Sequence, residues 1–201
     1  MLDAPIRRTI DPALLAIGRR LAALGVSPNG MTLASFAVGM SAALAIALGW
    51  TWVGLALLLL SRLGDGLDGW IARASDRQSD LGGYLDIVLD FVFYGAIPLA
   101  FAFLDPRSNA LAAGVLLLAF YANGASFLAY AMMVEKRGGA DRGPKSFLYT
   151  TGLAEGTETI GVFVAMCLFP DAFVWIAGGF AIVVAYTTLS RIMLARVAFR
   201  D

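Results

Sequence analysis

The stretch from Asp65 to Asp90, DGLDGWIARASDRQSDLGGYLDIVLD, decides how the chain folds. Apolar sequence lies on both sides of it, with LALLLL shortly before it and FVFYGAIPLAFAFL directly after it. The polar run from Ala74 to Asp80 predicts a loop between two apolar helices at about 53–73 and 81–104. Each helix is long enough to cross a bilayer. The stretch therefore predicts a helical hairpin in a membrane.

Four carboxylates recur in this hairpin with helical spacing. Asp65 and Asp68 are three residues apart, and Asp86 and Asp90 are four apart, so each pair projects from one face of its own helix. At roughly 1.5 Å per residue, both pairs lie about 8 to 9 Å inside the loop ends of their helices. A carboxylate in a membrane helix costs at least ~2.5 kcal/mol on insertion scales, so the acids need a compensating cation or a polar cavity. We expect the two pairs to face each other in one site.

The residue types of the chain limit the chemistry of that site. The chain contains no histidine and one cysteine, Cys167, which lies in an apolar run. Histidine bases and histidine metal ligands are therefore excluded, and carboxylates are the candidate bases. Oxygen ligands without histidine or cysteine favour Mg²⁺ or Mn²⁺.

Small residues and an arginine lie between the acid pairs, namely Gly69, Ala72, Arg73 and Gly82. Glycine and alanine leave the helix backbone open to a bulky ligand, and the arginine fork suits phosphate oxygens. Together with a metal cluster, these residues predict a diphosphate site. Tight helix packing is an equally good explanation of Gly69 and Gly82.

The eight positions Asp65-x2-Asp68-Gly69-x2-Ala72-Arg73-x8-Gly82-x3-Asp86-x3-Asp90 match the signature of the CDP-alcohol phosphotransferase family, which the chain therefore resembles. The resemblance implies that Asp65, Asp68 and Asp86 hold two divalent cations on the diphosphate of a CDP-linked lipid. It implies that Asp90, also counted among the metal ligands, is the general base that deprotonates an acceptor alcohol. A nucleotide pocket is implied at Asp68, Gly69, Ala72, Arg73 and Gly82, joined by Asn29 and Thr32. For the last two residues, helix capping is the alternative.

Composition extends the membrane prediction to the whole chain. Of 201 residues, 59% are hydrophobic and 15% charged, which is typical of an integral membrane protein. We expect an all-α protein with six transmembrane helices, at about 31–50, 53–73, 81–104, 109–134, 155–169 and 172–194. An amphipathic helix from Asp11 to Leu24, with Asp11 as its N-cap and Pro12 at its first helical position, is expected to lie on the membrane interface. Residues 1–30 then form an interfacial segment and residues 31–201 the catalytic membrane domain, and no cleavable signal peptide is expected.

The distribution of basic residues predicts the orientation. Six spans place both termini on one side, together with basic residues 7, 8, 19, 20, 77, 136, 137, 142, 145, 191, 196 and 200, whereas Arg107 falls on the other. By the positive-inside rule the site opens towards the cytoplasm, as expected for a bacterial inner-membrane protein. The formal net charge is zero, so no nucleic-acid partner is expected. Within the spans, Arg62 is expected to form a structural salt bridge with a carboxylate. Asn123 is expected to hydrogen-bond to a neighbouring helix, with a place facing the site as the alternative.

A second polar region gives candidates for the acceptor site: Lys136, Arg142, Lys145, Glu155 and Glu158. Topology-setting charge is the favoured explanation of the basic residues, and acids in a first helical turn favour the helix dipole without any ligand. In branches of the resembled family that use inositol phosphate, arginines stand near this position, where this chain has Gly156 and Thr159. An unphosphorylated polar alcohol is therefore the favoured acceptor. The basic loop leaves glycerol phosphate or inositol phosphate open.

The resemblance implies an enzyme that transfers a phosphatidyl group from CDP-diacylglycerol to an alcohol hydroxyl, releases CMP and forms a homodimer in the membrane. Two other interpretations remain. One is a divalent-cation transporter, although no internal repeat is evident and the acids lie near one membrane face. The other is an inactive membrane scaffold, for which four intramembrane acids have no benefit.

Overall fold

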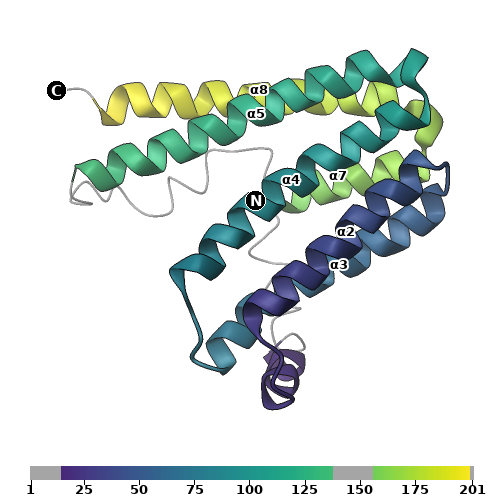
Figure 1. Ribbon diagram of the computed structural model, residues 1–201. Coiled ribbons are helices and arrows are strands. Elements are labelled where there is room, and N and C mark those ends of the chain that lie inside the picture. The colour runs from purple at the N-terminus through teal and green to yellow at the C-terminus, as the bar shows by residue number, and fades with distance from the viewer. Residues whose placement is uncertain (1–14, 138–155, 200–201) are drawn as a thin grey trace.

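The computed structural model describes residues 15–137 and 156–199, and within these ranges all regular structure is helical (Figure 1). A short helix spans residues 15–23. The further elements are α2 (Pro28–Ala47), α3 (Thr51–Ala74), α4 (Asp80–Leu104), α5 (Pro106–Lys136), α7 (Gly156–Leu168), a 3-10 turn (Pro170–Ala172) and α8 (Phe173–Ala198). The predicted all-α class is confirmed.

Four segments in the described part of the chain are long and apolar enough to cross a membrane. They are α2, α4, α5 and the segment Pro170–Ala198, which contains α8. The shorter apolar helix α7 has 13 residues, and α3 has 24 residues but carries the charges of Arg62, Asp65, Asp68 and Arg73. The protein is therefore a multi-pass membrane protein.

The start of α2 differs from the sequence prediction. Helix α2 begins at Pro28, and the hydroxyl of Ser27 accepts a 3.1 Å hydrogen bond from the Gly30 N–H. Ser27 is therefore the N-cap, and the capping roles considered for Asn29 and Thr32 are wrong. Proline suits the first helical position because its missing N–H has no partner there in any case.

The turn between α4 and α5 is tighter than expected. Asp105 ends α4 as predicted, and its carboxylate also caps α5 by accepting hydrogen bonds of 3.2 Å from the N–H groups of Arg107 and Ser108. Helix α5 consequently begins at Pro106 and not near Asn109. An aspartate cap followed by proline satisfies the first free N–H groups without a longer loop.

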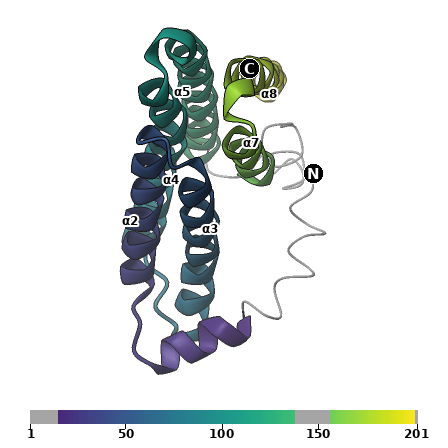
Figure 2. The same cartoon turned by 90° about the vertical axis from the view of Figure 1, so that its right-hand side faces the viewer.

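Helix α4 lies at the centre of the packing. It contacts α2 and α5, while α2 also packs along α3 and α5 along α8. Figure 2 shows α2, α3 and α4 together, and α7 lies next to both α3 and α8. The α4 residues Phe93 and Phe101 are fully buried, and Phe101 stacks on Phe173 with ring centroids 4.7 Å apart. The core therefore forms on the apolar half of α4 and leaves its polar half free for a site.

The loop ends of α2, α3 and α4 come together around one cavity, and the short helix 15–23 lies against the ends of α2 and α3 (Figure 2). A Cβ atom on Gly18 would lie only 2.8 Å from Cβ of Trp70, so glycine allows this helix to rest directly on α3. The expected interfacial helix thus has its described part at residues 15–23, and its expected start at Asp11 lies outside the described residues. This end of the molecule carries the acid pairs.

Candidate metal and nucleotide site

Three carboxylates converge between α3 and α4. Oxygen atoms of Asp65, Asp68 and Asp86 all lie within 4.8 Å of one another. The convergence follows from the sequence, because the pairs stand at similar depth on two helices joined by a short loop, with α3 ending at Ala74 and α4 beginning at Asp80. Three like charges this close repel, and hard oxygen donors are the ligands that Mg²⁺ and Mn²⁺ prefer. The donor set therefore fits a divalent cation.

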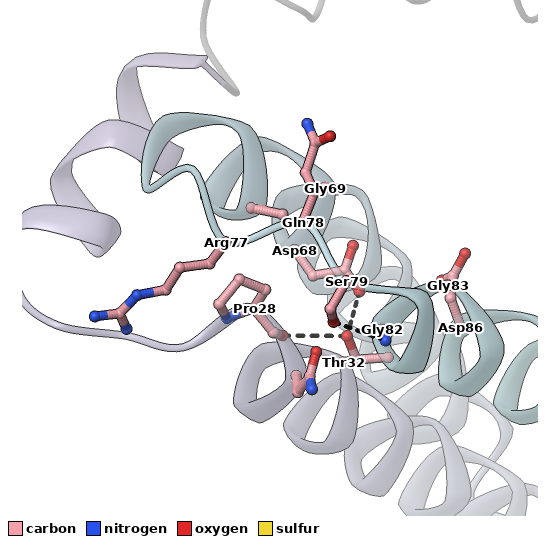
Figure 3. A pocket seen from close by; sticks show the side chains of 12 residues that line it. Pro28, Thr32, Asp68, Gly69, Arg77, Gln78, Ser79, Gly82, Gly83 and Asp86 are labelled. Atoms are coloured by element: carbon pink, nitrogen blue, oxygen red, sulfur yellow. Dashed lines mark hydrogen bonds between the residues drawn. The ribbon is translucent and has the colours of Figure 1, made fainter.

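Helix α2 contributes a hydroxyl to this cluster. Thr32 Oγ1 donates a 2.6 Å hydrogen bond to Oδ2 of Asp68 and also lies 3.1 Å from the Pro28 carbonyl oxygen (Figure 3). Thr32 is buried and Asp68 is partly buried. A hydrogen bond to a charged group fixes the direction of the carboxylate, so Asp68 is held by a helix other than its own.

Asp90 lies outside the close group of three and binds an arginine. Arg62 Nη1 donates a 2.7 Å hydrogen bond to Asp90 Oδ1 and lies 3.4 Å from Asp65 Oδ2. The arginine side chain is 13% exposed, and those of Asp65 and Asp90 are 25% and 27% exposed. The predicted salt bridge of Arg62 with a carboxylate is therefore present, and it links the two acid pairs.

A cavity of about 180 Å³ opens beside the acids (Figure 3). It is lined by Pro28, Asn29, Thr32, Asp68, Gly69, Ala72, Arg77, Gln78, Ser79, Gly82, Gly83 and Asp86. Most of the residues expected at a nucleotide lie on this list. Pro28, Gly83 and the loop residues 77–79 were not expected at the nucleotide. Ser79 could have been recognised as the N-cap of α4, where its hydroxyl accepts from the Gly82 N–H at 3.1 Å. Whether a loop side chain points into the cavity cannot be predicted from sequence periodicity, because a loop has no regular repeat.

Contacts at two residues of the expected nucleotide site refine its geometry. A Cβ on Gly82 would lie 3.0 Å from Oδ1 of Asn29, so this glycine admits the asparagine to the cavity. Arg73 does not line the cavity; its guanidinium lies 4.2 Å from the ring centroid of Trp70 and close to Gly69 at the cavity's edge. The indole ring therefore determines where Arg73 rests.

The expected acceptor residues are only partly described. Lys136 is the exposed last residue of α5, and Glu158 lies in the first turn of α7 and is partly exposed. Arg142, Lys145 and Glu155 lie outside the described residues. At the start of α7, a Cβ on Gly156 would lie 3.7 Å from the Tyr94 hydroxyl, and Tyr94 stands one turn after Asp90 on α4. The start of α7 therefore lies beside the helix that carries Asp90.

A part-buried arginine on α8 has no part in this cluster. Arg191 Nη1 donates to Oδ1 of Asn123 at 2.9 Å and to Oγ of Ser126 at 3.0 Å. These bonds join α8 to α5, as expected for Asn123 in a packing role, whereas Arg191 had been counted only as a topology charge. Its partner is 68 positions away in sequence, so only the fold reveals the pair.

Comparison with known proteins assigns this geometry to a class. The family described as CDP-alcohol phosphatidyltransferase matches residues 25–188. The chain therefore belongs to the CDP-alcohol phosphatidyltransferase family and is a membrane transferase of phospholipid biosynthesis. This membership favours the transferase interpretation over the cation transporter and the inactive scaffold that the sequence left open.

Relatives differ in how much of the chain they share. The inner membrane protein YnjF of Escherichia coli is 46% identical, over 96% of this chain and 94% of its own length. A CDP-diacylglycerol–serine O-phosphatidyltransferase of Mycobacterium tuberculosis is 35% identical over 40% of this chain and 28% of its own. The archaetidylinositol phosphate synthase of Pyrococcus horikoshii is 34% identical over 42% of this chain and 45% of its own.

Solved structures share the fold over nearly the whole chain. The phosphatidylinositol phosphate synthase of Mycobacterium tuberculosis with CDP-DAG bound has a TM-score of 0.68 at 19% identity and covers 94% of this chain and 97% of its own. The same enzyme in complex with manganese and citrate has a TM-score of 0.66 at 20% identity, with coverages of 94% and 92%. At this identity the likeness establishes the fold.

Proposed function

We propose that this protein transfers a phosphatidyl group from CDP-diacylglycerol to the hydroxyl of an unphosphorylated polar alcohol and releases CMP. The observation that carries the proposal is the convergence of Asp65, Asp68 and Asp86 within 4.8 Å, beside a cavity with small residues on its walls. A structural neighbour binds CDP-DAG, and a relative's name gives CDP-diacylglycerol as its substrate, which supports this donor.

Each part of the site has a role in binding the donor. Asp65, Asp68 and Asp86, with Asp90 at the edge of the group, would hold two Mg²⁺ or Mn²⁺ ions. When bound, such ions neutralise the diphosphate and stabilise the charge that develops on the leaving phosphate. The cytidine end would enter the cavity where the backbone is bare at Gly69, Ala72 and Gly82, between Asn29 and Thr32. Arg73 would reach the phosphates from its place on Trp70.

Asp90 is the proposed general base. The proton of the acceptor hydroxyl passes to the Asp90 carboxylate, and the hydroxyl oxygen forms a bond to the lipid-side phosphorus. The bond from that phosphorus to the bridging oxygen breaks, and its electron pair leaves with CMP. Asp90 stands one helical turn from Asp86, so the base lies next to the acid cluster and deeper in the membrane.

The acceptor is proposed to lack a phosphate. The sequence of α7, GTETIGVFVAMCL, contains no lysine or arginine, and its start lies beside Tyr94, one turn from Asp90. Glu155 and Glu158 are proposed to bind hydroxyl or amine groups of the acceptor. In the alternative, Lys136, Arg142 and Lys145 would bind the phosphate group of glycerol phosphate or inositol phosphate. The relatives' names include both serine and inositol phosphate chemistry, so family membership alone does not choose.

We propose six membrane crossings, with α3 and α7 added to the four apolar segments. Helix α3 lies along α2; Asp65, Asp68 and Arg73 stand in the half of α3 nearer the loop, and Arg62, at its middle, is paired with Asp90. This topology puts Arg19, Arg20 and Arg77 on one side, which the positive-inside rule makes the cytoplasm. Residues 1–30 would then lie on the inner face of a bacterial inner membrane, residues 31–201 would form the catalytic domain, and the protein would act as a homodimer among membrane lipids.

The experiment that tests the proposal measures CMP release by purified protein with CDP-diacylglycerol and Mn²⁺ or Mg²⁺. The acceptor panel is serine, inositol, choline, glycerol phosphate, inositol phosphate and phosphatidylglycerol. Metal-dependent release with serine, inositol or choline supports the proposal; release only with a phosphorylated acceptor overturns the acceptor assignment.

Asp90→Asn should abolish turnover and leave binding of the CDP-lipid intact, whereas the matched exposed variant Asp171→Asn should keep full activity. An active Asp90→Asn enzyme removes Asp90 from the mechanism.

A further inference from the structure

Arg62 lies inside α3 and contacts both acid pairs. Ser61 and Phe93 also contact its guanidinium. Its Nη1 binds Asp90 Oδ1 at 2.7 Å and lies 3.4 Å from Asp65 Oδ2. The first contact joins α3 to α4, because Asp90 is 28 positions after Arg62 in the sequence. The second contact joins consecutive turns of α3. Arg62 therefore connects an acid of the close group of three to the proposed base.

The guanidinium is fixed from two further directions. Its central carbon lies 4.0 Å from the ring centroid of Phe93, which is fully buried. Its Nη2 donates a 3.2 Å hydrogen bond to Oγ of Ser61, which in turn donates to the Ser35 carbonyl oxygen at 2.8 Å. Ser61 is fully buried, so this support cannot swing away. Only a planar, multi-donor group can stack on a ring and bind a hydroxyl and a carboxylate at once.

We propose that Arg62 is a positioning residue for phosphatidyl transfer. By binding Oδ1 of Asp90, it fixes the rotation of that carboxylate and leaves Oδ2 directed to the acceptor hydroxyl. By also lying against Asp65, it fixes the distance between the base and the carboxylates that face the donor. The inference rests on the proposed role of Asp90 as the base.

The need for such a residue follows from charge and geometry. Asp90 stands next to three other carboxylates, and without a cation its side chain would turn away from them. A reacting group displaced by about 1 Å can lose about 10²-fold in rate. A residue that only balanced charge would not need the ring and the hydroxyl that orient the Arg62 fork.

The test compares Arg62→Ala, Arg62→Lys and Asp90→Asn in the purified full-length enzyme, with methylguanidinium added as a free substitute for the missing fork. For Arg62→Ala we expect kcat to fall about 10²-fold, while KM for CDP-diacylglycerol stays within about threefold. Methylguanidinium should restore kcat about tenfold in this variant and leave Asp90→Asn inactive. Arg62→Lys should recover less than methylguanidinium does, because an ammonium cannot stack and bind two partners together.

Two readouts besides turnover separate positioning from a structural role. Thermal unfolding in detergent and calorimetric binding of CDP-diacylglycerol with Mn²⁺ should be nearly unchanged in Arg62→Ala. Arg191→Ala removes another part-buried arginine bound to a neighbouring helix, and methylguanidinium should leave its rate unchanged. Should Arg62→Ala not fold, Arg62→Gln is measured in its place, with the same expected loss of kcat.

The outcomes distinguish the two proposals. An Arg62 variant with the wild-type kcat beside an inactive Asp90→Asn overturns the positioning role and leaves the proposed function standing. An active Asp90→Asn enzyme overturns the proposed base and, with it, this inference. Loss of CDP-lipid binding without rescue by methylguanidinium assigns Arg62 to the fold and overturns the inference.

Discussion

The hydroxyl of Thr32 donates a 2.6 Å hydrogen bond to the carboxylate of Asp68, 36 positions later in the chain. This bond ties the second turn of α2 to the acid pair of α3 at the wall of the cavity. Helix α2 carries no acid of its own, yet it determines the direction of a proposed metal ligand. The site is thus built by three helices, although its sequence signature covers only two.

Replacing Thr32 with valine should weaken metal binding. Valine keeps the shape of the side chain and removes the donor, and a hydrogen bond to a charged group contributes about 1.5–3 kcal/mol. We expect the Mn²⁺ concentration for half-maximal CMP release to rise about tenfold, with the rate at saturating metal nearly unchanged, since about 1.4 kcal/mol is a factor of ten. Thr32→Ser keeps the hydroxyl and should restore the wild-type curve. Identical Mn²⁺ titrations for Thr32→Val and wild type would contradict this role.

The sequence predicts the acid cluster because three independent signals agree there. Apolar flanks indicate the two helices, the polar run marks the loop, and the three- and four-residue spacings put Asp65 with Asp68 and Asp86 with Asp90 on single faces. A short loop then forces the two faces to similar depth. The observed boundaries at Ala74 and Asp80 agree with this argument.

Contacts between distant helices could not be predicted in the same way. The partner of Thr32 depends on how α2 crosses α3. Likewise Arg191 reads as a flanking charge in sequence, but the packing of α8 on α5 gives it Asn123 as a partner. Sequence periodicity predicts on which face of its helix a residue lies, but the packing of the helices determines which residues that face contacts.

Removal of divalent metal should abolish CMP release, and Asp86→Asn should raise the metal requirement. An amide keeps the size of the side chain and removes one of the three charges that lie within 4.8 Å of one another. Hard divalent cations favour charged oxygen ligands, so we expect more than about tenfold weaker activation by Mn²⁺. The measurement is CMP release after EDTA treatment and stepwise return of Mn²⁺ or Mg²⁺. Full activity in EDTA would exclude a metal-dependent transfer.

Gly39 on α2 should be essential for stability, whereas Gly114 on α5 should tolerate alanine. A Cβ on Gly39 would lie 2.8 Å from both the Phe93 ring and Ser61 Oγ, but one on Gly114 would meet nothing within 4 Å. Overpacking of this kind costs typically about 1–3 kcal/mol, while glycine to alanine in an open helix gains up to about 1 kcal/mol. Thermal unfolding in detergent should therefore show a lower Tm for Gly39→Ala and an equal or higher Tm for Gly114→Ala. Equal Tm values for the two variants would refute the close approach of α2 to α3 and α4.

Trp70 should act on the donor site through Arg73. The indole ring supports the guanidinium at 4.2 Å, and such contacts contribute about 0.5–2 kcal/mol. In Trp70→Ala the guanidinium loses its place beside Gly69, so we expect KM for CDP-diacylglycerol to rise about three- to tenfold with kcat nearly unchanged. Trp70→Phe keeps an aromatic face and should behave like wild type.

A double-mutant cycle with Arg73→Ala tests whether Trp70 acts through Arg73. If it does, Trp70→Ala should not raise KM further in the Arg73→Ala background. Additive effects on KM would instead show that Trp70 serves the site by supporting the helix at residues 15–23, which rests on it at Gly18.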